Sequence, residues 1–391
     1  LAEAGLQGSD WFWTFIAYTH EPALITVNNL QKTIAPYSHP DTIRRALAEA
    51  ASRGFLQPID PDTYQLTPNG RHAIARFFQA TGAALASLPT ILPEEDMAQL
   101  VTLLNKVVAT TEAAPAPQAK PLFRASRRTD PGLNAAAAVR TDQFVTDLQY
   151  YREDAHLAAW QKYGVDGHVW ETLTYIWKDA PLTLADIIER TKARGYTAEA
   201  SADAIQELID RGWVTREKLN YRLSAAGFDL RQEAEQDTDQ NFSVGWLALN
   251  EVEAETLRQL LPRLSTTLHS LRAKQLAETY SHIFDRAGEI SQSIYSLTRS
   301  VINPIVEELQ FNRLGVFYDA YISKALEPAA FTLEQAKRRA PYASDVIWQV
   351  QLDALVELGM FTRNKAEYRL TPKGYAALDR MLGTFYNRMA E

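Results

Sequence analysis

Basic side chains that could bind nucleic-acid phosphates recur along the chain. Lysine and arginine donate hydrogen bonds to phosphate oxygens, and threonine, histidine and glutamine add groups that can reach the edges of bases. Such side chains gather on predicted helices and hairpins at His39, Thr42, Arg44, Arg45, Arg216, Lys218, Lys337, Arg338, Arg339, Gln349, Arg363 and Lys365. The chemistry that these residue types predict is the binding of double-stranded DNA, with no bond made or broken.

Groups for catalysis are sparse in the sequence. The chain has no cysteine, which excludes disulfides, thiolate zinc sites and a cysteine nucleophile. None of the seven histidines lies four residues from another, so no helical metal-binding pair is formed. A glycine-rich phosphate loop and a Gly-x-Ser-x-Gly turn are also absent. We therefore predict no enzyme activity, no metal site and no cofactor.

The candidate residues belong to a pattern that occurs three times. Each copy has an apolar-Thr-apolar entry, a glycine after an amphipathic helix, and a Tyr-x-Leu-Thr/Ser-x-x-Gly exit. The entries are centred on Thr26, Thr183 and Thr332, the glycines are Gly54, Gly212 and Gly359, and the exits run over 64–70, 221–227 and 368–374. The matched spacings predict three copies of one module.

Each module is predicted to be helix, turn, helix and two-stranded hairpin. The entry threonine can accept a hydrogen bond from a free backbone N–H of the next helix. Residues four and seven positions before each glycine are apolar and share one helical face. The glycine lets the chain leave that helix in a left-handed conformation. This order resembles the MarR-like winged-helix superfamily, which implies that the helix before the glycine is a recognition helix and the hairpin a wing.

The fold class that follows is mainly α with small β-hairpin wings, as three tandem winged-helix domains joined by long helices. A chain of 391 residues suits about three domains. We predict winged helix 1 with flanking helices over 8–110, an Ala/Pro-rich linker over 111–141, winged helix 2 with flanking helices over 142–265, connecting helices over 266–312 and winged helix 3 over 313–391. The long helices could form a dimer interface or pack the copies together, and both interpretations stay open.

The linker is distinguished by its composition. Alanine and proline alternate at 114–117, and three arginines follow at Arg124, Arg127 and Arg128. This composition predicts an extended, solvated spacer. The alternative is a basic arm that touches phosphates.

A narrower resemblance covers about a third of the chain, roughly 141–261. A run at 152–159 has an arginine, a histidine four residues later and paired alanines, and a Glu-x-x-Thr-Asp run at 235–239 precedes Trp246. In this order the motifs resemble an actinobacterial-type helix-turn-helix family, mostly uncharacterised. The resemblance implies the fold of this region more than its function.

The three predicted recognition helices differ in charge. The first carries Thr42, Arg44 and Arg45 and is preceded by His39. The third follows a basic turn at 337–339. The second is acidic and would repel a phosphate backbone, through Glu199, Asp203, Glu207 and Asp210. We predict that modules 1 and 3 read duplex DNA as part of transcriptional regulation.

The alternative function is a non-enzymatic scaffold whose winged helices bind protein. The formal net charge of −8 and the acidic second helix favour a protein partner at winged helix 2. A small apolar effector could enter a cleft lined by the aromatic clusters at 11–18 and 150–177. A remote alternative is a tandem winged-helix DNA glycosylase, because residues 349–351 match its Gln-x-Gln pair.

The sequence also predicts a cytoplasmic protein that does not enter the membrane. No apolar run approaches the roughly 20 residues of a membrane span. The first residues lack a basic region followed by an apolar stretch.

Overall fold

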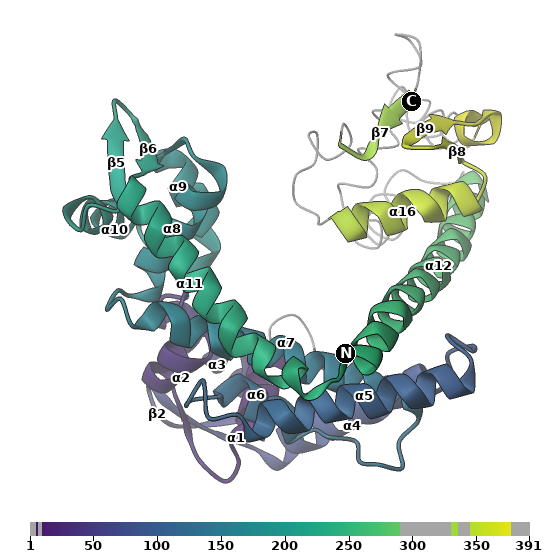
Figure 1. Ribbon diagram of the computed structural model, residues 1–391, viewed down its shortest axis with the longest axis horizontal. Coiled ribbons are helices and arrows are strands. Elements are labelled where there is room, and N and C mark those ends of the chain that lie inside the picture. Colours follow the sequence, from purple (N-terminus) through teal and green to yellow (C-terminus); the bar gives the residue numbers. More distant parts are fainter. Residues whose placement is uncertain (1–4, 7–9, 290–329, 335–344, 377–391) are drawn as a thin grey trace. The chain divides into compact units, whose positions relative to one another are not determined.

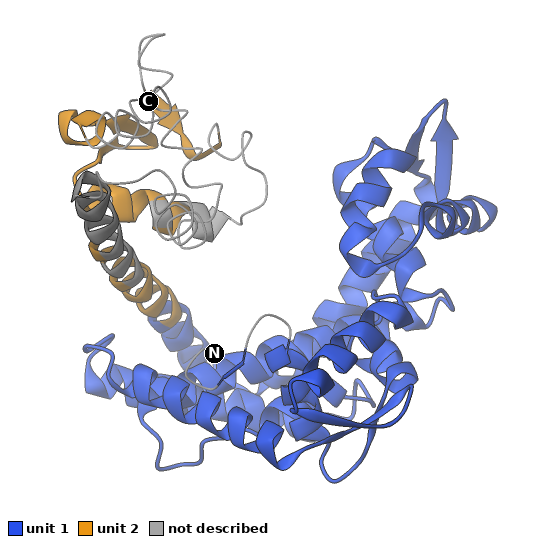
Figure 2. Ribbon diagram, turned by 180° about the vertical axis from the view of Figure 1, so that it is seen from behind, with its two compact units in different colours: residues 1–260 blue, residues 261–391 orange. Residues whose placement is uncertain are grey.

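The computed structural model describes residues 5–6, 10–289, 330–334 and 345–376 (Figure 1). The chain divides into two compact units, Leu1–Leu260 and Leu261–Glu391, which Figure 2 shows in different colours. The described part is mainly helical, with small antiparallel sheets, as predicted. Its α-helices are α1 Asp10–His20, α2 Val27–Thr33, α3 Pro40–Ser52, α4 Pro68–Ala86, α5 Glu94–Ala113, α6 Pro121–Arg127, α7 Ala137–Gln161, α8 Gly167–Asp179, α9 Leu184–Thr191, α10 Ala198–Asp210, α11 Ala225–Ser243, α12 Glu251–Glu289 and α16 Asp345–Glu357.

Three sheets share one topology in the described residues. In each, the entry strand pairs antiparallel with the last strand of a hairpin, and that strand pairs with the first strand of the hairpin. The strands are β1 Ile25–Thr26, β2 Leu56–Asp60 and β3 Thr63–Leu66, then β4 Leu182–Thr183, β5 Val214–Glu217 and β6 Asn220–Leu223, then β7 Ala330–Thr332, β8 Phe361–Asn364 and β9 Glu367–Leu370. We call 25–70, 182–227 and 330–374 the first, second and third modules, and β2–β3, β5–β6 and β8–β9 their hairpins.

The predicted caps at Thr26 and Thr183 and the three helix-ending glycines are present in the structure. The cap predicted at Thr332 precedes residues 335–344, which lie outside the described residues. The Thr26 hydroxyl accepts from the backbone N–H of Asn29 at 3.2 Å and caps α2. The Thr183 hydroxyl accepts from the N–H of Asp186 at 3.2 Å, and the Asp186 carboxylate accepts from the N–H of Thr183 at 2.8 Å. This reciprocal pair is a capping box. The helix-ending glycines have left-handed backbones, with φ of 78°, 74° and 75° at Gly54, Gly212 and Gly359.

The recurring Thr/Ser-x-x-Gly exit also has a structural reason. The Thr67 hydroxyl donates to the carbonyl of Gly54 at 2.7 Å and accepts from the N–H of Gly70 at 3.0 Å. A Cβ atom at Gly70 would overlap the carbonyl of Phe55, so only glycine fits there. The same hydroxyl bridge recurs at Ser224 and Thr371.

Apolar residues of the glycine-terminated helices form the module cores. Leu47 and Ala50 on α3 are fully buried, and Leu208 on α10 is fully buried. Leu352 and Leu355 on α16 are buried in the same positions relative to their glycine. Helices α5, α6 and α11 pack on the long helix α7. The described connection after residue 251 is the single helix α12, which overlaps the predicted connecting helices of 266–312.

The Ala/Pro-rich segment is not an extended linker, which corrects the prediction for 111–141. Lys120 is buried, and its Nζ donates to the carbonyls of Thr111 at 2.7 Å and Ala114 at 2.6 Å, at the end of α5. The side chains of Leu122 and Phe123 are buried beyond it. The buried amine of Lys120 and the apolar side chains of Leu122 and Phe123 therefore hold this segment against the protein. Its average composition is nevertheless that of an extended linker.

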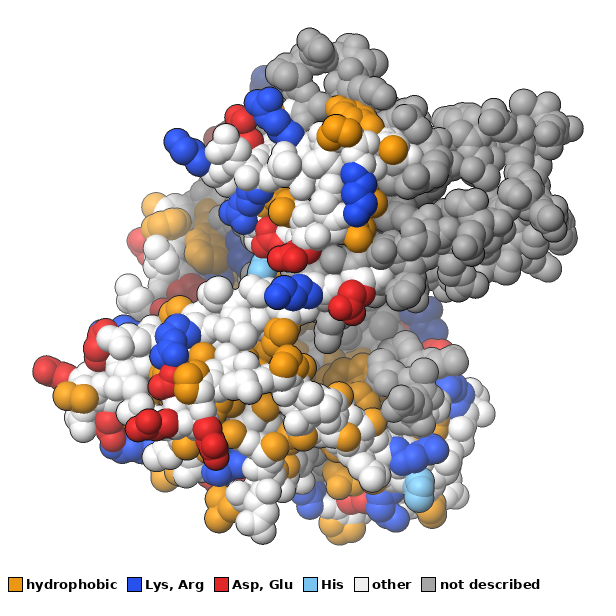
Figure 3. Space-filling model, turned by 90° about the vertical axis from the view of Figure 1, so that its right-hand side faces the viewer, with side chains coloured by type: hydrophobic (Ala, Val, Ile, Leu, Met, Phe, Trp, Pro, Cys, Tyr) orange, Lys and Arg blue, Asp and Glu red, His pale blue; other side chains and the backbone are white. Residues whose placement is uncertain are grey.

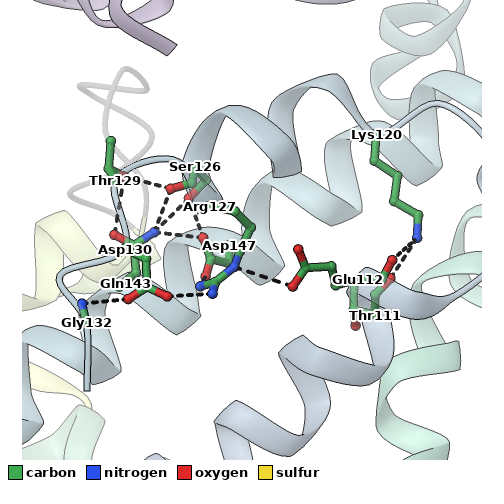
Figure 4. Close-up of polar contacts among 10 residues, drawn as sticks. All are labelled: Thr111, Glu112, Lys120, Ser126, Arg127, Thr129, Asp130, Gly132, Gln143 and Asp147. Carbon is green, nitrogen blue, oxygen red and sulfur yellow. Dashed lines mark hydrogen bonds and ion pairs between the residues drawn. The ribbon is translucent and has the colours of Figure 1, made fainter.

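Two of the three arginines of this segment, Arg127 and Arg128, are bound within the protein, and Figure 4 shows the contacts of Arg127. Arg127 Nη1 donates to the buried carboxylate of Asp147 at 2.8 Å, and Ser126 donates to the same carboxylate at 2.5 Å. Arg127 Nη2 donates to Asp130 at 2.5 Å. Arg128 donates to the carbonyl of Thr19 at 2.5 Å, so it contacts α1.

Candidate nucleic-acid interface

The start of α3 lies against the second module. The backbone N–H of His39 donates to the carbonyl of Arg194 at 2.9 Å, and the Thr42 hydroxyl donates to the same oxygen at 3.2 Å. The His39 ring meets Tyr196 edge on, with centroids 5.2 Å apart. Gly195 has φ +86°, and a Cβ atom at this position would overlap the Thr42 hydroxyl. Both predicted DNA-contacting residues at this helix start are therefore engaged within the protein.

A second layer of contacts supports this junction. The Arg194 guanidinium is paired with Glu171, with Nη2 and Oε1 2.7 Å apart, and lies 5.8 Å from the centroid of the Tyr37 ring. Burial raises the pKa of Tyr37 well above its usual range. A Cβ atom at Gly167 would overlap the carbonyl of Pro36. The turn before α3 is thus packed against the second module.

Arg44 and Arg45 on α3 both bond to nearby side chains, and those that bind Arg44 are acidic. Arg44 Nε donates to Asp62 Oδ1 at 2.7 Å, and Arg44 also pairs with Asp41. This hydrogen bond with Asp62 is the largest cause that raises the pKa of Arg44. Arg45 donates to the Thr42 hydroxyl at 3.2 Å. Because the tip of the first hairpin carries Asp60 and Asp62 and no basic residue, the first module offers little net positive charge to a phosphate.

Helix α10 presents acidic groups, as predicted. Glu199, Asp203 and Asp210 are exposed on it. The Gln206 side-chain amide donates to Asp210 Oδ1 at 2.8 Å. A helix surface of this charge repels phosphates, so α10 itself does not favour contact with a phosphate backbone.

The second and third hairpins hold an arginine and a lysine in one geometry. Arg216 Nε donates to the carbonyl of Lys218 at 2.9 Å, and its guanidinium lies 5.9 Å from the centroid of the Tyr221 ring. Arg363 Nε donates to the carbonyl of Lys365 at 3.0 Å. Its guanidinium lies 5.5 Å from the centroid of the equivalent tyrosine ring of β9.

Backbone conformation at the turn completes this shared geometry. Lys218 and Lys365 are the non-glycine residues with positive φ in the described chain, at 58° and 54°. Each lysine is the first residue of a two-residue turn and lies two positions after the arginine. The residues on either side of this turn pair across the two strands. Lys218 and Lys365 are both exposed, and each can reach a phosphate beside its arginine. The first hairpin has Pro58 at the arginine position.

Gln349 lies in a network inside the third module. Its Nε2 donates to Asp353 Oδ1 at 3.0 Å and to the Tyr368 hydroxyl at 2.5 Å. Arg363 Nη1 lies 3.3 Å from Asp353 Oδ1, and His269 Nε2 lies 2.5 Å from Asp353 Oδ2. The Gln349 amide is therefore turned toward the hairpin and not free to meet a base.

The predicted residues Lys337, Arg338 and Arg339 lie outside the described residues. On the face drawn in Figure 3, Lys and Arg side chains of the described chain alternate with acidic and apolar ones. No continuous basic field is seen among the coloured side chains of that view.

Comparison with known proteins identifies a family for the middle of the chain. A model of a helix-turn-helix family matches residues 70–274, just over half of the chain. The chain belongs to this helix-turn-helix family. The match contains the whole second module and confirms the helix-turn-helix resemblance noted for 141–261. No curated protein and no solved structure matches the chain.

Titratable groups in the helix-turn-helix region have structural partners. His156 Nδ1 lies 3.3 Å from the Thr238 hydroxyl, and burial lowers the pKa of His156 to about 4.

Within the described ranges, no group of three or more His, Asp or Glu side chains could hold a metal ion. No helix in the described part of the chain combines the length and apolar character that a membrane span requires.

The aromatic clusters contribute to the cores of this helix-turn-helix protein. Trp160 and Trp170 are buried and stacked, with ring centroids 5.7 Å apart. Trp11 stacks on Phe77 with centroids 5.7 Å apart. These contacts match the use of aromatic side chains as large buried surfaces and give no support to the effector cleft.

Sequence reasoning missed three groups that contact the predicted site residues. The sequence shows Asp62 as an acidic residue at a predicted hairpin tip, and its negative charge is evidence against a basic surface on the first module. Asp353 lies four residues after Gln349, a helical spacing that predicts contact. The Arg194 carbonyl has no sequence signal, because any residue provides a carbonyl.

Proposed function

We propose that this helix-turn-helix protein binds duplex DNA through the hairpins of its second and third modules and acts in transcriptional regulation. The observation that carries the proposal is the repeated Arg-x-Lys geometry at 216–218 and 363–365. In each of these hairpins the arginine guanidinium lies near a tyrosine ring, and an exposed lysine is next to it. Several hydrogen-bond donors are therefore presented at the tip of a short, rigid hairpin. Such donors bind phosphate oxygens and position a protein on a duplex.

In this proposal the three modules are tandem winged helices of the MarR-like type, and the hairpins are their wings. The topology of the three sheets and the helix-ending glycines support this assignment. The modules nevertheless differ in role from the sequence prediction. The first module serves mainly as a structural partner of the second, because the start of its α3 is covered.

The proposed mechanism involves no chemistry on the nucleic acid. Lys218 and Lys365 would neutralise phosphates and release counterions, so affinity depends on salt concentration. The arginines add directional hydrogen bonds. The Gln-x-Gln match gives no support to a glycosylase, because the Gln349 amide is bound within the third module.

Fluorescence anisotropy with a labelled random duplex tests the proposal. We expect the full chain to bind at low salt and to lose affinity as salt rises. Arg216→Ala/Lys218→Ala and Arg363→Ala/Lys365→Ala should each weaken binding, and should each flatten the slope of log affinity against log salt by about 1 to 2.

The matched control is Gln57→Ala/Gln65→Ala, which removes two exposed polar side chains from the first hairpin. It should leave both affinity and salt slope unchanged. Equal losses in the control and in the charge variants would contradict a specific role for the two basic hairpins. Absence of duplex binding by the wild-type chain would contradict the proposal altogether.

A protein-binding scaffold is the second candidate. The exposed acidic face of α10 favours it, because that face cannot approach phosphates. A partner for this face would carry basic side chains. Substituting Glu199, Asp203 and Asp210 with their amides should then abolish capture of the partner without weakening DNA binding, measured by pull-down and by anisotropy.

A further inference from the structure

The arginine of the third hairpin has a carboxylate neighbour on α16 that the arginine of the second hairpin lacks. Arg363 Nη1 lies 3.3 Å from Asp353 Oδ1. Among the residues that the structure describes, no carboxylate lies within 4 Å of the Arg216 guanidinium. The position six residues before the helix-ending glycine is Asp353 in the third module and Gln206 in the second. Gln206 is exposed and bonds along its own helix to Asp210.

Asp353 connects α16 and β8 of the third module with α12. Its Oδ1 accepts from Gln349 on α16 and faces Arg363 on β8, while its Oδ2 lies 2.5 Å from His269 Nε2 on α12. The Asp353 side chain is 22% exposed, against 44% for Arg363. The carboxylate is thus held in place by its neighbours, whereas the guanidinium keeps an outward surface for a ligand.

We infer that Asp353 is an internal competitor of DNA phosphate for Arg363 and thereby sets the affinity of the third hairpin for DNA. The inference rests on the proposed function. A carboxylate and a phosphate oxygen accept the same guanidinium hydrogen bonds. The fixed negative charge also repels an approaching phosphate. The third module therefore binds DNA more weakly than its basic hairpin alone would allow.

Asp353→Asn tests this inference because it removes the charge and keeps the shape. With a random duplex and the full chain, we expect binding to tighten by about 3-fold to 10-fold at moderate salt. The slope of log affinity against log salt should steepen by about 0.9, as expected for one additional phosphate contact. The tighter binding and the steeper salt slope should both disappear in Arg363→Gln/Asp353→Asn. Position 363 then has no guanidinium that the loss of the Asp353 charge could free to bind phosphate.

The reciprocal control installs the carboxylate in the second module. Gln206→Asp should weaken duplex binding and flatten the salt slope, because Arg216 then acquires the same competitor. Thermal unfolding should show that each variant is folded. Should Asp353→Asn fail to fold, Gln206→Asp decides the question, and unchanged binding by that variant would overturn the inference.

The outcomes separate this inference from the proposed function. Wild-type binding without any gain in Asp353→Asn would overturn the inference alone. An equal gain in the Arg363→Gln background would also overturn it, because the effect would not pass through the arginine. Failure of both wild type and Asp353→Asn to bind duplex DNA at low salt would overturn the inference and the proposed function together.

Discussion

At the scale of single residues, the docking of α6 depends on one buried carboxylate. Asp154 Oδ1 accepts from the N–H of Leu122 at 3.1 Å, and Asp154 Oδ2 accepts from the N–H of Phe123 at 2.8 Å. Burial raises the pKa of Asp154 from 3.8 to about 7, although both N–H groups act in the opposite direction. The folded protein therefore binds this proton more tightly than the unfolded chain.

Asp154→Asn should change how stability depends on pH. The stability that the raised pKa of Asp154 contributes is fully present below its ordinary value of 3.8 and is lost as pH rises through about 7. The lowered pKa of His156 acts oppositely, with stability lost as pH falls through about 4. We therefore compare the stability of the variant with that of wild type at each pH. We expect Asp154→Asn to gain about 4 kcal/mol relative to wild type between pH 4 and pH 7, because each unit of pKa shift corresponds to about 1.4 kcal/mol.

Urea denaturation across that pH range measures this difference. His156→Gln is a useful control because its relative stability should change with the opposite sign. A difference between Asp154→Asn and wild type that stays constant with pH would contradict the burial of a carboxylate with a raised pKa.

Gly195→Ala should loosen the contact between the first and second modules. An alanine there needs a left-handed backbone and would overlap the Thr42 hydroxyl. We expect a loss of about 2 to 4 kcal/mol in the free energy of unfolding. Gly212→Ala is the matched control, because Gly212 has φ +74° and nothing within 4 Å of a Cβ atom.

Only the backbone penalty of about 1 kcal/mol should appear in that control. Chemical denaturation of the two variants gives the comparison. Equal losses of stability would show that the contact with Thr42 contributes nothing to the fold.

At the scale of elements, local signals predicted the modules well. Threonine caps, helix-ending glycines and Tyr-x-Leu strands act through neighbouring backbone groups, so sequence spacing alone locates them. The 111–141 segment was predicted incorrectly because composition averages over residues, whereas docking depends on Lys120, Leu122 and Phe123 individually. The charge pairing of Arg44 with Asp62 depends on how the hairpin folds back on α3 and was missed for that reason.

Lys120→Met should release the end of α5 and the start of α6. The ammonium group donates to the carbonyls of Thr111 and Ala114 near the end of α5, where a positive charge also favours the helix dipole. Its loss leaves these carbonyls without their donor, at a cost of about 1 to 3 kcal/mol. Amide hydrogen exchange over 112–123 should become faster.

Lys178→Met is the control for this variant, since Lys178 is exposed at the end of α8. It should leave exchange over 112–123 unchanged. Unaltered protection in Lys120→Met would mean that apolar packing alone docks the segment.

At the scale of the whole molecule, charge is distributed unevenly over the three modules. The chain is acidic overall, with a formal net charge of −8, yet the second and third hairpins each expose an arginine and a lysine. The contact between α3 and the second module could not be predicted, because it joins residues more than 150 positions apart through a backbone carbonyl. In the proposed function, the basic hairpins of the second and third modules therefore take the place of the first and third modules that the sequence predicted to bind DNA.

Photo-crosslinking from the hairpin tips would test most directly which modules meet DNA. A photoreactive amino acid is placed singly at Ile59, close to the turn of the first hairpin, or at Leu219 or Ala366, in the turns of the second and third hairpins. All three positions are exposed. We predict that a labelled duplex is captured from positions 219 and 366 and not from position 59, and that capture falls as salt rises. Capture from position 59 alone, or equal capture from all three tips, would contradict DNA binding by the two basic hairpins.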